Sequence, residues 1–142
     1  MSAGLEGECV EIVGLDHIQL AMPAGCEEAG RQFYVGCLGL REVRKPASLS
    51  SRGGCWFVGP GMAIHLGVED DFAPALKAHL AFRVADLEAA RKALLAAGAP
   101  VVEDTSLEGV RRFYSEDVFG NRLEFTQSGD TAPWAGPRLP SR

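Results

Sequence analysis

The segment DVFGNRLEF, residues 117–125, combines a turn signal with a short β-strand. The pair Gly120-Asn121 favours a turn because both residue types adopt positive φ at low cost. In the strand that follows, alternation places Leu123 and Phe125 on one face and Glu124 on the other. A carboxylate in mid-strand is ordinary if its face meets water. If that face lines a concave cavity, the charge needs a partner, and a metal ion is one candidate.

An internal repeat places this strand at the end of the second of two similar units. Residues 17–20 (HIQL) correspond to residues 79–82 (HLAF), and residues 64–66 (IHL) correspond to residues 123–125 (LEF). Each unit has the order strand, helix, strand, strand, strand and spans about 60 residues, which is the signature of a duplicated structural unit.

The two units predict a single α+β domain over residues 1–142. Module one covers about residues 13–70 and module two about residues 77–128, each with the pattern βαβββ. We expect their strands to form one curved eight-stranded mixed sheet around a concave cavity, with the helices outside. Residues 129–142 contain three prolines and no hydrophobic period, so we expect an extended tail.

The composition excludes several classes of function. A formal net charge of −5 argues against a nucleic-acid partner, which calls for a basic surface. No apolar run approaches the roughly 20 residues of a membrane span. The acidic N-terminus lacks the basic and apolar regions of a signal peptide, and the four cysteines show no CxxC spacing. We therefore expect a cytoplasmic protein with reduced thiols.

All three histidines of the chain fall at polar-face positions of predicted strands: His17, His65 and His79. Glu124 holds the position in module two that His65 holds in module one. Any one histidine alone is more often an isolated surface or core residue. Four residues at equivalent positions favour a site for one divalent metal ion, and this ligand set suits Zn²⁺, Ni²⁺, Co²⁺ or Fe²⁺.

The chain resembles the vicinal oxygen chelate superfamily over residues 13–127. This superfamily includes glyoxalase I, fosfomycin-resistance proteins, bleomycin-binding proteins, methylmalonyl-CoA epimerase and extradiol dioxygenases. The motifs that carry the resemblance are Asp16-His17-Ile18, Phe33-Tyr34 followed by Leu38-Gly39-Leu40, His79-Leu80-Ala81-Phe82 with Asp86-Leu87, and Asp117-Val118-Phe119-Gly120-Asn121 leading to Glu124.

The resemblance implies a metal site with ligands from the first and last strands of each unit, namely His17, His65, His79 and Glu124. Glyoxalase I has a glutamate where this chain has His65, and fosfomycin-resistance proteins use three ligands. Bleomycin binders lack the metal set, so its presence here counts against that group. Family members often form homodimers in which each site takes one unit from each chain.

The implied chemistry is that of a metal-dependent lyase or isomerase acting on a small substrate with vicinal oxygens. A metal with an open position stabilises an oxyanion as a Lewis acid, and Glu124 would take a proton from carbon as the catalytic base. Two alternatives stay open. One is a non-catalytic protein that binds and sequesters a small molecule such as an antibiotic. The other, ranked lower, is a dioxygenase with Fe²⁺ held by two histidines and Glu124.

Four further residues are candidates for substrate binding: Arg83, Trp56, Gln19 and Arg112. Arg83 shares a strand face with His79 and could bind a substrate carboxylate or phosphate, or pair with a surface acid instead. Arg112 is either a solvent-exposed charge or a residue that reaches the pocket. Trp56 and Phe57 alternate, so one is expected to line the cavity and the other to join the core.

Overall fold

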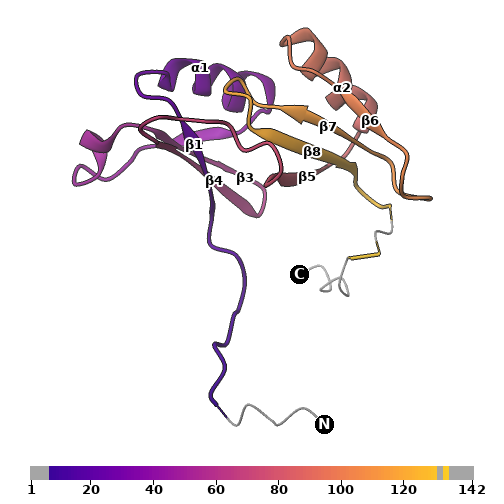
Figure 1. Ribbon diagram of the computed structural model, residues 1–142, viewed down its shortest axis with the longest axis horizontal. Helices are drawn as coiled ribbons and strands as arrows, with labels where there is room; N and C mark the ends of the chain where they lie inside the picture. Colours follow the sequence, from indigo (N-terminus) through magenta and orange to yellow (C-terminus); the bar gives the residue numbers. More distant parts are fainter. Residues whose placement is uncertain (1–6, 131–132, 135–142) are drawn as a thin grey trace.

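The computed structural model describes residues 7–130 and 133–134 (Figure 1). The remaining residues of the predicted tail, 131–132 and 135–142, lie outside the described part. Module one consists of β1 (Ile18–Met22), α1 (Glu27–Arg31), the π-helix η1 (Gln32–Cys37), β2 (Arg41–Val43), the 3-10 helix η2 (Ser50–Arg52), β3 (Cys55–Gly59) and β4 (Met62–Val68). Module two consists of β5 (Leu80–Val84), α2 (Leu87–Ala96), β6 (Val102–Asp104), β7 (Arg112–Glu116) and β8 (Arg122–Gln127).

The two modules have the same topology, as the repeat predicted. Module one forms a four-stranded sheet with the order β1-β4-β3-β2, and module two forms one with the order β5-β8-β7-β6. The first and last strands of each module are parallel neighbours, and the other pairs are antiparallel. Helices α1 and α2 lie on the same side of the two sheets (Figure 1). The α+β class, the βαβββ modules and the eight strands are confirmed, and the strands are divided between two four-stranded sheets where one eight-stranded sheet was expected.

Helix α2 shows how the local sequence sets an element. The side chain of Asp86 accepts a hydrogen bond from the Ala89 N–H at 3.1 Å and caps the first turn. Gly98, with φ of 81°, follows the helix end and takes the left-handed conformation common there. The apolar face buries Leu87 and Leu94 against module two.

The DVFGN turn, residues 117–121, joins the two modules. Asp117 accepts hydrogen bonds from the Asn121 N–H and from the hydroxyl of Tyr34, the latter at 2.7 Å. The amide of Asn121 donates to the Ala21 carbonyl of β1 at 2.9 Å. Tyr34 is fully buried, and this burial, together with the charge of Asp117, raises the pKa of its hydroxyl well above the ordinary value.

The first strand is shorter than its alternation suggests. Alternation predicts a strand from Val13, but β1 begins at Ile18. The register pairs Ile18 with Ile64, so Asp16 would stand level with Met62, where β4 begins. Within the described part of the chain, residues 7–15 have no neighbouring strand to pair with, and they extend away from the body (Figure 1). No helix of the described residues is long and apolar enough to cross a membrane.

Candidate metal centre

Strand β8 separates an apolar face from a polar one, as its alternation predicts. Leu123 and Phe125 are buried in the core shared with helix α2. Glu124 points to the opposite face and is nevertheless 95% buried, with 5% of its surface exposed. A carboxylate this deeply buried needs charged or hydrogen-bonding partners.

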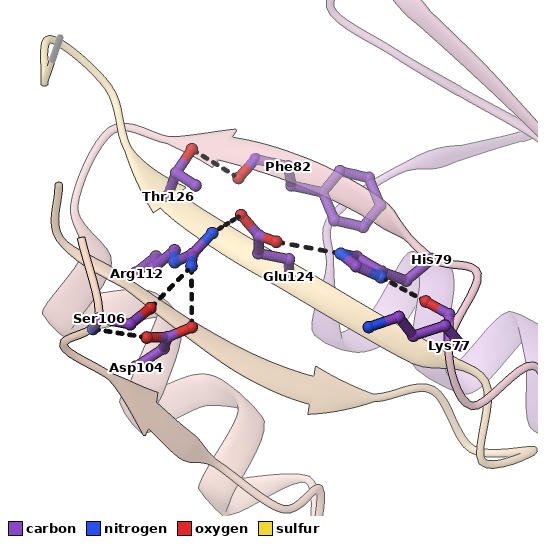
Figure 2. A network of polar contacts seen from close by, with 8 residues as sticks. All are labelled: Lys77, His79, Phe82, Asp104, Ser106, Arg112, Glu124 and Thr126. Atoms are coloured by element: carbon purple, nitrogen blue, oxygen red, sulfur yellow. Dashed lines mark hydrogen bonds and ion pairs between the residues drawn. The ribbon is translucent and has the colours of Figure 1, made fainter. Parts of the chain in front are cut away.

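The first partner of Glu124 is His79, which directly precedes β5. The Nε2 atom of His79 lies 3.0 Å from Oε1 of Glu124 (Figure 2). Nδ1 lies 2.8 Å from the carbonyl oxygen of Lys77, and because a carbonyl only accepts, Nδ1 carries the proton. Nε2 therefore faces the carboxylate, and either a proton or a metal ion lies between the two atoms.

The His79–Glu124 pair fits a metal ion on the chemistry and spacing of its donors. Two donor atoms bound about 2.1 Å from one ion, at roughly right angles, lie about 3 Å apart. The observed separation between Nε2 and Oε1 is 3.0 Å. The Lys77 carbonyl that fixes the imidazole is also the usual kind of outer partner for a metal-bound histidine.

The second partner of Glu124 is Arg112, on the neighbouring strand β7. Its Nη1 lies 3.5 Å from Oε2 of Glu124, and its Nη2 donates to Oδ2 of Asp104 at 2.9 Å and to Oγ of Ser106 at 3.3 Å (Figure 2). The side chain is only 12% exposed. The guanidinium thus bridges two carboxylates inside the protein, and its predicted substrate contact stays a prediction. Its Nε is buried without a hydrogen-bond partner among the described residues.

The equivalent position in module one holds a stack of three aromatic rings. The rings of His17 and His65 lie 4.1 Å apart at an interplanar angle of 19°, and Trp56 covers the other side of His65 at 4.2 Å and 9°. Nδ1 of His17 also contacts Asp16 at 2.7 Å. Burial lowers the pKa of His65, and the neighbouring His17 lowers it further.

The stacked rings constrain metal binding by the His17–His65 pair. A metal ion bound to an imidazole nitrogen lies close to the plane of that ring. Two nearly parallel planes do not meet near their rings, so His17 and His65 cannot both direct a nitrogen at one ion without a ring rotation. In this module, only one histidine at a time is ready to act as a ligand.

The structure brings the four predicted ligands together as two pairs and not as one set. The His17–His65 pair belongs to module one and the His79–Glu124 pair to module two. Within residues 7–130 and 133–134, no group of three or more His, Cys, Asp or Glu side chains is placed to hold a metal ion. A complete four-residue site would need the two pairs to come from different molecules.

The other predicted site residues lie on the same polar faces. Gln19 stands beside His65 in the register of β1 and β4, and its side chain crosses Gly67, where a Cβ would come within 2.5 Å of its amide nitrogen. Arg83 is exposed at the end of β5. Trp56 lines the polar face and Phe57 is fully buried in the core, as their alternation predicted.

Tyr114 and Asp104 complete the surroundings of the second pair. Alternation places Tyr114 on the strand face of Arg112, within reach of the pocket, whereas Asp104 was not predicted. The Tyr114 ring packs edge-on against His79 at 5.5 Å and stands opposite Glu124 in the register. It therefore occupies in module two the place that Trp56 occupies in module one. The repeat offset also points to Tyr114, whereas the partnership of Asp104 with Arg112 depends on the pairing of β6 with β7.

A cavity lies on the opposite side of the sheets from the two donor pairs. About 640 Å³ opens on the helix side between the modules, lined in part by Phe33, Gly98, Asp117 and Phe119. None of the predicted site residues lines this cavity. The candidate metal centre therefore lies at the two donor pairs and not in this cavity.

Comparison with known proteins agrees with the observed architecture. Residues 20–126 match the family model described as a glyoxalase-like domain. A glyoxalase family protein from Bacillus anthracis is 44% identical, with 84% of this chain and 98% of that chain covered and a TM-score of 0.79. An integron cassette protein from the Halifax Harbour sewage outfall metagenome is 26% identical, with coverage of 82% and 99% and a TM-score of 0.67.

The fold also occurs in a fosfomycin-resistance protein. A mutant of FosX from Listeria monocytogenes, solved with Mn(II) and a dihydroxypropylphosphonic acid, is 21% identical, with coverage of 82% and 93% and a TM-score of 0.70. At this identity the likeness concerns the fold alone. No curated protein shows significant similarity to the chain.

Proposed function

The chain belongs to the glyoxalase-like domain family, and from this premise we propose that it is a divalent-metal-dependent lyase or isomerase acting on a small substrate with vicinal oxygens. The observation that carries the proposal is the contact between Nε2 of His79 and Oε1 of Glu124 at 3.0 Å. Both atoms can act as metal ligands, and the Lys77 carbonyl and Arg112 supply the outer partners that such a pair needs. The same fold holds Mn(II) in the FosX complex.

The site is proposed to be shared between two copies of the chain. His79 and Glu124 of one protomer would hold the ion together with His17 of the other, and with His65 if its ring leaves the stack. This arrangement accounts for the separation of the two pairs within one chain. A bound divalent ion supplies Lewis-acid stabilisation of a substrate oxyanion.

Glu124 is the proposed base, and the chain positions it for that task. Arg112 contacts Oε2 and leaves Oε1 directed at His79, so the two carboxylate oxygens have different surroundings. A proton taken from a substrate carbon would reside on this carboxylate. Arg83 offers an exposed charge for an anionic substrate group, and the ring of Trp56 and the amide of Gln19 offer an apolar wall and a polar contact.

Metal titration tests the proposal directly. Protein stripped with chelator is titrated with Zn²⁺, Ni²⁺, Co²⁺, Fe²⁺ and Mn²⁺ by calorimetry, and we expect one ion per chain at micromolar affinity or tighter. His79→Ala should lower the stoichiometry, whereas Cys9→Ser, at an exposed position, should leave it unchanged. Protein that binds none of these ions at micromolar concentration would exclude the proposed enzyme.

A second candidate function is the binding of a flat small molecule without catalysis. The stack of Trp56, His65 and His17 favours it, because aligned rings also pack well against a planar ligand. The two functions separate by metal dependence. A binder would hold planar compounds equally well in chelator-treated protein, and the proposed enzyme would lose its substrate affinity there.

A further inference from the structure

The segment that precedes β1 exposes an unusual amount of apolar surface. Residues 7–16, called here the N-terminal arm, extend away from the sheets (Figure 1). Within the arm Val10, Ile12, Val13 and Leu15 are 86%, 79%, 95% and 87% exposed. Contiguous exposed apolar residues on a small protein usually mark an interaction site. The direction of the arm presents them to another molecule and not to its own sheets.

A second apolar surface lies beside the His79–Glu124 pair. Leu76, Pro100 and Val102 line a cavity of about 210 Å³ together with Tyr114 and Arg122, and this cavity is called here the Leu76–Val102 groove. Leu76 is 68% exposed and Val102 is 60% exposed. The Tyr114 ring in its wall lies 5.5 Å from His79, so the groove adjoins the second ligand pair.

The two surfaces also differ in charge. The arm carries Glu8, Glu11 and Asp16 and contains no lysine or arginine. The groove is lined by Arg122 and flanked by Lys77, and within the described residues neither of these makes an ion pair. One carboxylate, Glu116, also lines it. The charges therefore favour an acidic apolar strand as the occupant.

We infer that the arm of one protomer docks in the Leu76–Val102 groove of a second copy of this chain. The inference rests on the proposed shared site, because a partner that places its His79 next to His17 also brings its groove next to the arm. Residues 10–15 lie two to seven residues before His17, and Leu76 lies three residues before His79. An extended chain advances about 3.3 Å per residue, so the arm is long enough to reach the groove.

Charged substitutions in the arm test this inference. The double variant Ile12→Asp/Val13→Asp changes only exposed side chains, so the protomer fold should be retained, which circular dichroism checks. Sedimentation velocity should show the dimer dissociation constant raised about tenfold or more, because burial of the new carboxylates is costly. The control Leu95→Asp, at a position on α2 that is 55% exposed, should dimerise like the wild type.

An unchanged dimer in the arm variant, or a wild type that stays monomeric at every concentration tested, would overturn the inference. Cross-linking supplies a second measurement that uses the native Cys9, which is exposed in the arm. With Val102→Cys and a short bismaleimide we expect a covalent dimer that disappears when Cys9→Ser is added. An intramolecular product would place the arm on its own groove and would also overturn the inference.

The same variants separate this inference from the proposed function. Dimerisation and cross-linking are measured in metal-free and metal-loaded protein. If no metal binds, the proposed enzyme fails, and the dimerisation and cross-linking results still decide the role of the arm. If metal binds to the arm variant at high protein concentration with the wild-type stoichiometry while its dimer is weakened, both ideas stand. If metal binds and the dimer is unaffected, the arm inference alone fails.

Discussion

The two modules place different chemistry at the same point of one fold. In module one the first-strand histidine, His17, stacks on His65, and in module two its counterpart, His79, contacts Glu124. The register that aligns His65 with Gln19 equally aligns Glu124 with Ala81. The last strand thus carries an imidazole in module one and a carboxylate in module two, and the first-strand histidine stacks on the former and contacts the latter.

The surroundings of the two positions deepen this difference. Glu124 is contacted by Arg112, whose counterpart in module one is Gly54. Gly54 has a φ of 80°, and a Cβ there would lie 2.0 Å from the Leu66 carbonyl oxygen. A side chain at this position would clash with the backbone, so module one has no residue that corresponds to Arg112. The two modules thus share one topology and differ in the side chains at equivalent positions.

Replacement of Glu124 and of His65, one in each module, should give the largest difference in metal affinity. For Glu124→Gln we expect metal affinity to fall at least about a thousandfold, beyond the ~100-fold that the loss of an outer partner causes, because the anionic donor is gone. For His65→Gln we expect a loss of about tenfold or less, because His65 must leave its stack before it can bind. Calorimetric titration of both variants measures the difference. Equal losses would show that the two modules contribute alike.

Removal of the Arg112 guanidinium, which pairs with Glu124, should lower the free energy of unfolding. Arg112→Met leaves Asp104 and Glu124 without their shared partner, and we expect the free energy of unfolding to fall by about 3 kcal/mol. The matched control is Arg111→Met. The Arg111 side chain is 69% exposed where it pairs with Asp130, so its loss should leave stability close to that of the wild type.

Urea denaturation of the metal-free protein measures both arginine variants. An Arg112 variant as stable as the Arg111 variant would show that Glu124 does not depend on its buried cation. The same comparison bears on function, since a loosened carboxylate should also bind metal less tightly.

Removal of Trp56 from its stack with His65 should change the pKa of His65. Trp56→Leu exposes one face of His65, so the pKa of His65 in metal-free protein should rise towards its ordinary value of about 6.5. In the wild type this pKa is lowered by folding. The stabilising contribution of the neutral His65 is therefore complete at pH above the pKa that His65 has in the unfolded protein. It is lost as the pH falls through that pKa towards the lower pKa of the folded protein.

NMR titration of the imidazole C–H signals checks the pKa, and urea denaturation between about pH 7 and pH 5 checks the linkage. The wild type should lose stability over this window more steeply than His65→Gln does. An identical slope in the two proteins would mean that burial of His65 is not what sets its titration.

Sequence reasoning succeeded where the signal is local. Alternation and the repeat predicted both modules and the polar-face positions of His17, His79 and Glu124, because a strand's period fixes which way each side chain points. It did not predict the stack of His65 on Trp56, because ring packing depends on neighbours from another strand.

Three further features were beyond local pattern. The bridging role of Arg112 requires the cross-strand pairing of β6, β7 and β8, which no local spacing encodes. The separation of the two ligand pairs depends on how the modules pack, which the repeat leaves open. The absence of strand structure at residues 13–15 reflects the start of the partner strand β4 at Met62, level with Asp16.

The two modules also differ at the N-termini of their helices, where we expect the smallest effect on stability. Asp86 caps α2 with its side chain, whereas Cys26, at the start of α1, makes no capping hydrogen bond. Asp86→Ala should lower the free energy of unfolding by about 1 kcal/mol. Cys26→Asp should raise it by less than about 0.5 kcal/mol, since its φ of −111° and ψ of 22° lie outside the extended region that capping residues prefer. Glu27 and Glu28 already place negative charge in that first turn, which further limits the gain. Thermal unfolding of both variants measures the two effects, and a gain at Cys26 as large as the loss at Asp86 would show that backbone geometry does not limit capping in module one.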